Sequence, residues 1–239
     1  MKSIPRRYVS AFSLILGLVA GGVASGQTIT KTPFAALRLQ VVRDSGRVNA
    51  ASVLVRQEVS ERDVIMYFVT AGHLFKNEYG DLLPDARSVT VEIGSGRTLD
   101  VLPRDIHLPR GNMVDVAVLK VTAPSSLLVT PVLTLAVPPA GSSFSVAGFD
   151  SGGRPVQADQ RVRRAATLIV NGDRAMPVID GCAGAAAVGE RGVFGIVSTC
   201  ESNQLPVIIP FSAVADWIGH CVPGGLTLQR PVQTRFEFQ

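Results

Sequence analysis

The chain is patterned as a series of short apolar runs separated by turn residues. Residues 48–58 alternate between two faces, as a strand with a buried face does. The turn signal Asp44-Ser45-Gly46 separates this run from a similar one at residues 35–43. A helical period first appears at residues 212–218, where Ser212 is a candidate N-cap. The pattern predicts a mostly β protein with a helix near its end.

Further strands are predicted where β-branched and aromatic residues cluster between glycines and prolines. They are residues 64–70, 89–93, 98–102, 113–121, 162–170, 175–179, 192–198 and 205–210. Asn171-Gly172 is a hairpin signal and predicts the turn between residues 162–170 and 175–179. With 239 residues, 23 of them glycine and 15 proline, the chain can form one large all-β domain or a pair of small barrels.

Residues 1–26 have the features of a secretory signal peptide. A basic head with Lys2, Arg6 and Arg7 precedes an apolar stretch, and Ala24-Ser25-Gly26 forms a small-residue cleavage site. The apolar stretch falls short of the roughly 20 residues that span a bilayer, which disfavours a membrane anchor. We therefore expect a secreted or periplasmic protein that does not associate with the membrane after cleavage.

The charge of the chain changes when this segment is removed. The formal net charge of +4 includes three basic and no acidic residues of the leader, so +1 remains (4 minus 3). No block of basic residues is left, and nucleic acid is not an expected partner. The sequence has no metal-ligand cluster or phosphate-binding loop, and His107 and His220 are isolated. We expect neither a metal nor a cofactor.

Two polar residues and one loop are candidates for chemistry. His73 follows an apolar strand at a small-residue turn, and Asp115 lies at the mouth of another apolar strand. A buried unpaired carboxylate is costly, so Asp115 should have a partner; a structural histidine and a strand-capping aspartate are the alternatives. The loop Gly181-Cys182-Ala183-Gly184-Ala185-Ala186 is rich in small residues, which suits backbone amides that must approach a ligand closely.

These segments resemble landmarks of the trypsin-like serine proteases, in the same order. Val69-Thr70-Ala71-Gly72-His73 resembles the Val-Thr-Ala-Ala-His segment of that family, and Asp115-Val116-Ala117-Val118-Leu119 resembles its Asp-Ile-Ala-Leu-Leu strand. The loop at residues 181–186 resembles its Gly-x-Ser-Gly-Gly-Pro turn, and Gly195-Ile196-Val197-Ser198 resembles the strand after it. With similarities at residues 139–149 and 205–218, the match covers about residues 34–220.

The resemblance implies an all-β fold of two six-stranded antiparallel β-barrels with a C-terminal helix. Residues 27–124 would form the first barrel, with His73 and Asp115, and residues 125–239 the second barrel and the helix. It also implies that His73 is the catalytic base, that Asp115 orients it, and that the site lies between the barrels.

The resemblance also implies that the catalytic nucleophile is missing. Ala183 stands where the family has its serine, and the amides of Gly181 and Ala183 would form the oxyanion hole. Shifting the register by one makes Cys182 the nucleophile but brings Asp180 into the oxyanion hole, where its carboxylate would oppose the developing charge. A serine enzyme in which the nucleophile was replaced at Ala183 is a third alternative.

The predicted function follows from this degenerate site. The resemblance places Pro177 and Ser198 in the specificity pocket, where the absence of a carboxylate gives no support for Lys or Arg selectivity. We predict a monomeric, catalytically impaired pseudoprotease that retains a cleft for a peptide or protein ligand. An active endopeptidase of the same fold is the alternative.

Three cysteines allow one internal disulfide in an exported protein. We favour a bond between Cys200 and Cys221, which would leave Cys182 free. The rival pairing of Cys182 with Cys200 would tie the small-residue loop to the neighbouring strand and exclude a cysteine nucleophile.

Overall fold

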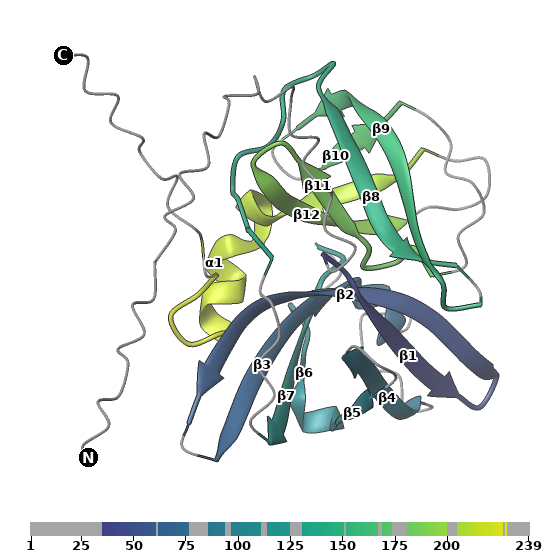
Figure 1. Cartoon of the computed structure of the whole chain (residues 1–239), viewed down its shortest axis with the longest axis vertical. Helices are drawn as coiled ribbons and strands as arrows, with labels where there is room; N and C mark the ends of the chain where they lie inside the picture. The colour runs from purple at the N-terminus through teal and green to yellow at the C-terminus, as the bar shows by residue number, and fades with distance from the viewer. Residues whose placement is uncertain are drawn as a thin grey trace, which may run out of the picture. The chain divides into compact units, whose positions relative to one another are not determined.

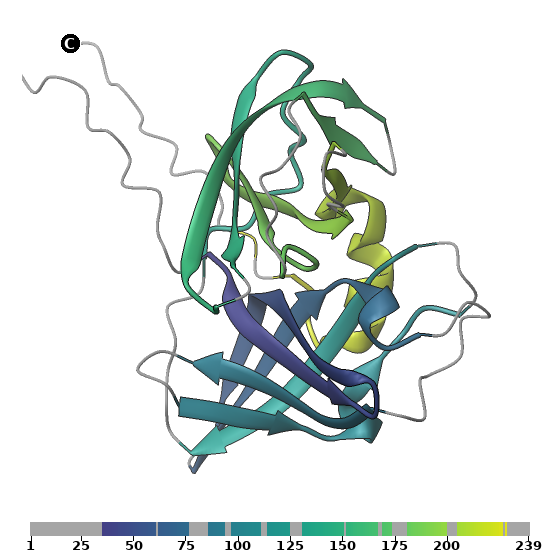
Figure 2. The same cartoon turned by 90° about the vertical axis from the view of Figure 1, so that its right-hand side faces the viewer.

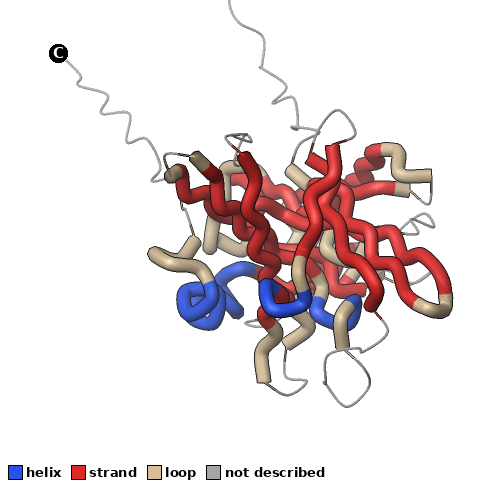
Figure 3. Tube along the Cα trace, turned by 90° about the horizontal axis from the view of Figure 1, so that it is seen from below, coloured by secondary structure: helices blue, strands red, loops and turns tan. Residues whose placement is uncertain are grey.

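The computed structural model describes eleven parts of the chain: residues 35–60, 62–76, 86–93, 97–110, 114–124, 131–150, 152–166, 169–173, 181–199, 205–226 and 228. The predicted signal peptide, Pro177, Asp180 and Cys200 lie outside these residues. The described chain forms two antiparallel sheets and one α-helix (Figure 1). Strands dominate the described trace, and the helical structure within it is α1 and two short 3-10 turns (Figure 3).

The first sheet has seven strands in the order β5-β4-β1-β2-β3-β7-β6. They are β1 (Leu37–Arg43), β2 (Gly46–Val59), β3 (Asp63–Thr70), β4 (Ala86–Ile93), β5 (Arg97–Val101), β6 (Ile106–His107) and β7 (Ala117–Pro124). The 3-10 turns are Gly72–Leu74 and Pro103–Asp105. Because β5 also lies against β7, the sheet curls around its own apolar core (Figure 2).

The second sheet is a closed barrel in the order β10-β13-β12-β11-β8-β9. Its strands are β8 (Ser143–Phe149), β9 (Pro155–Ala165), β10 (Val170–Gly172), β11 (Ala186–Gly189), β12 (Gly192–Thr199) and β13 (Val207–Pro210). Phe144 and Phe194 meet edge to face in its core, with ring centroids 5.6 Å apart. The all-β fold class is confirmed, but the first sheet is a curled seven-stranded sheet where a closed six-stranded barrel is expected.

Strand β2 explains how the two sheets share a core. Its residues 51–55 are all buried, so both faces are covered, in agreement with the prediction of at least one buried face. Leu54 packs in the core of the first sheet. Val53 and Val55 point the other way, into an apolar cluster that also contains Phe194 of the second barrel. The candidate site lies along this seam.

Helix α1 (Phe211–Cys221) follows β13 directly and packs on β12 and β13. Its buried side chains are Phe211, Val214 and Ile218. Pro210, not Ser212, occupies the N-cap, without a side-chain cap, so the helix begins two residues earlier than an N-cap at Ser212 predicts. No helix in the described part of the chain is long and apolar enough to cross a membrane.

The hairpin turn predicted at Asn171-Gly172 is wrong. Both residues lie in β10, where Asn171 pairs with Arg164 of β9. A Cβ atom at Gly172 would lie 2.6 Å from Gln160 Oε1 and 2.7 Å from Pro206 Cγ. Glycine therefore serves close packing at this position, not a turn; the predicted return strand at residues 175–179 lies outside the described residues.

Candidate functional site

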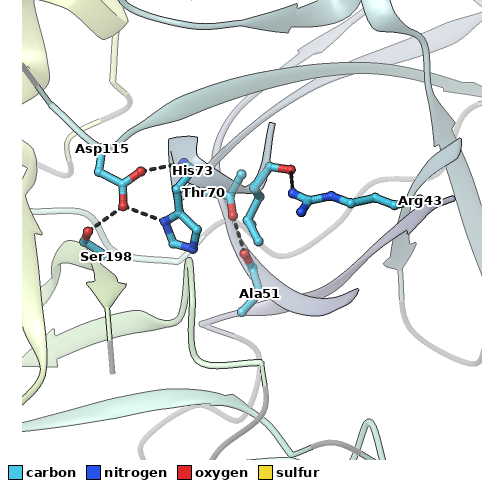
Figure 4. A network of polar contacts seen from close by, with 7 residues as sticks. Arg43, Ala51, Thr70, His73, Asp115 and Ser198 are labelled. Atoms are coloured by element: carbon cyan, nitrogen blue, oxygen red, sulfur yellow. Dashed lines mark hydrogen bonds and ion pairs between the residues drawn. The ribbon is translucent and has the colours of Figure 1, made fainter. Parts of the chain in front are cut away.

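The structure brings His73 and Asp115 together at the seam of the two sheets. His73 Nδ1 lies 2.8 Å from Asp115 Oδ2, and the backbone N–H of His73 donates to Oδ1 at 2.6 Å (Figure 4). An ionised carboxylate only accepts hydrogen bonds, so Nδ1 carries a proton and donates it. These two bonds fix the orientation of the imidazole and leave Nε2 directed away from Asp115.

The local fold accounts for this placement. Strands β3 and β7 pair up to Thr70 and Ala117, so the chain segments that carry His73 and Asp115 leave the sheet at the same edge. A Cβ atom at Gly72 would lie 2.8 Å from the carbonyl oxygen and 2.9 Å from the nitrogen of Val116. Gly72 thus allows the histidine turn to lie directly against the residue next to Asp115.

Ser198 of β12 reaches the same carboxylate from the second sheet. Its hydroxyl donates to Asp115 Oδ2 at 2.5 Å, and the residue is only 5% exposed (Figure 4). The sequence-based expectation that Ser198 lines a specificity pocket does not describe this contact. The feature of the sequence that points to this contact is a hydroxyl residue near the end of an otherwise apolar strand, because a buried polar group needs a hydrogen-bond partner.

The electrostatics of the site centre on Asp115. Burial raises the pKa of its carboxyl, but the hydrogen bonds and charge of His73 and the Ser198 hydroxyl outweigh burial and hold the pKa below its usual range. The carboxyl is therefore ionised at neutral pH. Lys76 adds a second charge: burial lowers the pKa of its ammonium and the charge of Asp115 opposes this, while Nζ donates to the Pro109 carbonyl at 3.3 Å.

The small-residue loop packs against the turn that carries His73. The N–H of Ala51 donates to the Ala183 carbonyl at 2.8 Å. The Thr70 hydroxyl donates to the Ala51 carbonyl at 2.6 Å (Figure 4). Gly184 has a φ of +78°, and a Cβ atom there would lie 2.0 Å from the Ala51 oxygen and 2.2 Å from Thr70 Oγ1. Only glycine fits, and it places the loop beside the base of the histidine turn.

Strand β12 holds the other side of this loop. The N–H of Gly184 donates to the Val197 carbonyl and the N–H of Val197 to the Ala185 carbonyl, both at 2.8 Å. Val197 precedes Ser198, so one strand positions both the loop and Asp115. Among the described residues, the N–H groups of Gly181 and Ala183 have no hydrogen-bond acceptor. These are the two amides that the resemblance assigns to an oxyanion hole.

The cysteines are arranged differently from the favoured prediction. Cys221 has a free thiol, so the expected bond between Cys200 and Cys221 is wrong. Cys182 is disulfide-bonded and 6% exposed. Cys200 lies outside the described residues but is the remaining cysteine of the three in the sequence. A disulfide-bonded sulfur offers no thiolate, so Cys182 has no nucleophile in this state.

Other features of the described chain do not add to this site. Pro177, the predicted base of the specificity pocket, lies outside the described residues. No group of three His, Cys, Asp or Glu side chains within the described ranges could hold a metal ion. A cavity of about 540 Å³ lies in the second barrel, lined by residues that include Pro138, Glu190 and Phe194 but not His73 or Asp115.

Solved structures of trypsin-like serine proteases and their relatives match this architecture. The inactivated protease paralogue S-I1 of the scabies mite has a TM-score of 0.60 and 14% sequence identity over 79% of this chain and 93% of its own. The chain has the trypsin-like fold. The active form of the Rv3671c protease of M. tuberculosis has a TM-score of 0.58 and 16% sequence identity over 84% of each chain. Kallikrein-related peptidase 10 has a TM-score of 0.57 and 16% sequence identity over 80% of this chain and 95% of its own.

At these identities the likeness of the trypsin-like structures extends to the fold alone. No protein-family model and no curated protein sequence matches the chain. The chemistry of the site must therefore be argued from its own residues.

Proposed function

We propose that this protein is an exported, monomeric pseudoprotease of trypsin-like fold that binds a peptide or protein ligand between its two sheets without cleaving it. Ala183 carries the proposal. It lies in the loop that Gly184 seats against Ala51 and Thr70, and its methyl group has no oxygen with which to attack a carbonyl. In a protease whose catalytic triad was removed residue by residue, loss of the nucleophile lowers the catalytic rate about a million-fold.

The remaining parts of the site support ligand binding. His73 is oriented by Asp115, Asp115 is held by Ser198, and two loop amides are available as donors. Such a constellation binds a ligand carbonyl whether or not a nucleophile is present. The scabies mite neighbour is named an inactivated protease paralogue, which indicates that the fold is used without proteolysis elsewhere.

The two enzyme alternatives make different predictions. The disulfide at Cys182 argues against a cysteine protease, because labelling by electrophilic peptide probes needs a free thiolate. A serine enzyme altered at Ala183 would have a serine codon at this position of the natural gene. An alanine codon there excludes that alternative.

Restoring one hydroxyl tests the proposal. We expect no hydrolysis of p-nitrophenyl butyrate by the parent and measurable hydrolysis by Ala183→Ser, because His73 can accept the new hydroxyl proton. The activity should disappear in the double variant Ala183→Ser with His73→Ala. Ester hydrolysis by the parent that is lost in Cys182→Ala would show a working cysteine enzyme. A folded but inactive Ala183→Ser protein would show that the rest of the catalytic arrangement has not been retained.

A further inference from the structure

We propose that the cavity of the second barrel binds residues 229–239 of the same chain, a segment that lies outside the described residues. This inference goes beyond the proposed function, because the cavity is lined by neither His73 nor Asp115. It follows from the direction of the chain at Leu228, from the apolar and charged side chains around the cavity, and from the sequence of the segment.

The chain approaches the cavity beside residues that line it. Leu133 forms one parallel bridge with Val193 of β12 and another with Leu228, so three segments of the chain lie side by side. Both segments of a parallel bridge run in the same direction. The chain beyond Leu228 is therefore directed the same way as residues 134–139, and five of these six residues line the cavity.

Apolar side chains are exposed around this bridge. Val132, Leu135 and Leu228 are 42%, 37% and 42% exposed, and they are three of the six large apolar residues that are exposed in the described chain. Val132 and Leu135 flank the bridge residue Leu133. Exposed apolar side chains that gather at one place mark a surface that another segment or protein covers.

The cavity has an apolar inner lining. Its volume of about 540 Å³ lies within the range of roughly 300–1,000 Å³ that is typical of ligand pockets. Val137, Pro138 and the buried ring of Phe194 line it. A Cβ atom at Gly189 would lie 3.1 Å from Pro138 Cγ and 3.5 Å from Phe194 Cδ1, so the missing side chain of Gly189 leaves room between these two rings.

Two charged residues of opposite sign lie at the exposed edge of the cavity. Glu190 and Arg191 form the turn between β11 and β12, and both residues are exposed. Within the described part of the chain, neither side chain forms a hydrogen bond or an ion pair. Both charges are therefore available to a segment that carries one charge of each sign.

The sequence of the segment matches this lining. Residues 235–238 read Arg-Phe-Glu-Phe. Alternate side chains of an extended chain point to opposite faces, so the two phenylalanines would share one face and the two charges the other. The phenylalanines suit the apolar lining, and the charges are complementary to Glu190 and Arg191 at the edge.

The attachment at Leu228 favours this segment over a separate ligand. An extended chain spans about 3.3 Å per residue, so the eight residues from Leu228 to Phe236 reach about 26 Å, which exceeds the width of a cavity of this volume. A short tether gives an effective concentration on the order of millimolar, so weak contacts suffice. Pro231 has no N–H donor and cannot continue the strand pairing, which leaves side-chain contacts to hold the segment.

Protection from trypsin tests the inference. Trypsin cleaves after Arg235 but not after Arg230, which precedes a proline, so release of residues 236–239 reports on a single bond. Release from the mature protein is followed by mass spectrometry at several protein concentrations, with a synthetic peptide of residues 229–239 as the unprotected reference. Cleavage of a bound segment depends on the small population that is unbound, so we expect release from the parent to be at least about tenfold slower than from the peptide.

Substitutions in the cavity and in the segment should remove this protection. Ala136 is exposed and lines the cavity, so Ala136→Trp fills the space and should release residues 236–239 at the rate of the free peptide. Ala166→Trp, the same change at an exposed position that does not line this cavity, should keep the parent rate. Phe238→Ser leaves the barrel unchanged and should speed release even if Ala136→Trp does not fold.

A second measurement shows whether the cavity binds the segment directly. The double variant Phe236→Ser with Phe238→Ser leaves the cavity open to a fluorescein-labelled peptide of residues 229–239. Because the parent cavity is occupied for most of the time, we expect the peptide to bind the double variant at least about tenfold tighter than the parent, measured by fluorescence anisotropy. Adding Ala136→Trp to the double variant should abolish binding.

Three results would overturn the inference. Release from the parent at the rate of the free peptide would show that the segment is not bound. Protection that persists in both Ala136→Trp and Phe238→Ser would place the segment elsewhere on the protein. Protection that is lost on dilution would show that the segment occupies the cavity of a second copy and would refute binding within one chain. These results leave the proposed function untouched, because none of them involves His73 or Ala183.

Discussion

At the scale of single residues, Asp115 is the best determined part of the site. It accepts hydrogen bonds from the backbone and ring of His73 and from Ser198. Three donors on one carboxylate fix the position of the imidazole relative to the second sheet. Each of these donors also lowers the pKa of the Asp115 carboxyl against the effect of burial, which makes the site sensitive to acid.

We expect Ser198→Ala to lower the free energy of unfolding by about 2 kcal/mol at pH 7, because a hydrogen bond to a charged group is lost. The Asp115 pKa is lower in the folded than in the unfolded protein, so its ionised form stabilises the fold. This contribution is complete above the unfolded value of about 3.9 and is lost as the pH falls through the folded value. Urea unfolding at several pH values should therefore show the difference between parent and Ser198→Ala shrinking below about pH 4. A difference that is independent of pH would contradict this account.

Two glycines with similar backbone angles provide a matched test of the loop. Gly184 and Gly141 have φ of +78° and +86°, but only Gly184 is crowded; a Cβ atom at Gly141 meets nothing within 4 Å. We expect Gly141→Ala to cost about 1 kcal/mol through its backbone alone and Gly184→Ala to cost about 4 kcal/mol. Thermal unfolding of both variants measures the loss of stability. Equal losses would show that the close contacts of Gly184 with Ala51 and Thr70 are not what requires glycine at this position.

At the scale of elements, helix α1 closes the second barrel through one apolar face. Ile218 is fully buried, whereas Ser212 is exposed and forms no side-chain cap. We expect Ile218→Ala to lower the unfolding free energy by about 3 kcal/mol, since it leaves a cavity under the helix. Ser212→Ala should change it by less than about 0.5 kcal/mol. Chemical denaturation of the two variants measures these changes. A large loss of stability in Ser212→Ala would contradict this expectation and indicate that Ser212 caps the helix.

At the scale of the whole molecule, the two sheets share one apolar cluster. Val53 and Val69 of the first sheet and Phe194 of the second barrel belong to it, and the bond from Ser198 to Asp115 joins the sheets beside it. We expect the mature protein to unfold in a single calorimetric transition, with Val53→Ala shifting the whole transition to lower temperature. Two separate transitions, only one of them moved by Val53→Ala, would show that the sheets unfold independently.

The sequence by itself determined the features that depend on near neighbours. Alternation and turn residues indicate the strands because side chains of a strand point to opposite faces, and small residues mark the loop at Gly181–Ala186 because bulk would exclude a close approach of the backbone. The positions of His73 and Asp115 at strand ends are likewise visible in a single pass along the chain.

Tertiary structure alone decided which distant residues meet. Ser198 and Asp115 are 83 positions apart, and their contact depends on how the second barrel packs against the first sheet. The disulfide at Cys182 and the tight packing of Gly172 against Gln160 and Pro206 are decided in the same way. Local patterns record whether a side chain is buried, but the partner that satisfies a buried polar group is chosen by the packing of elements far apart in the chain.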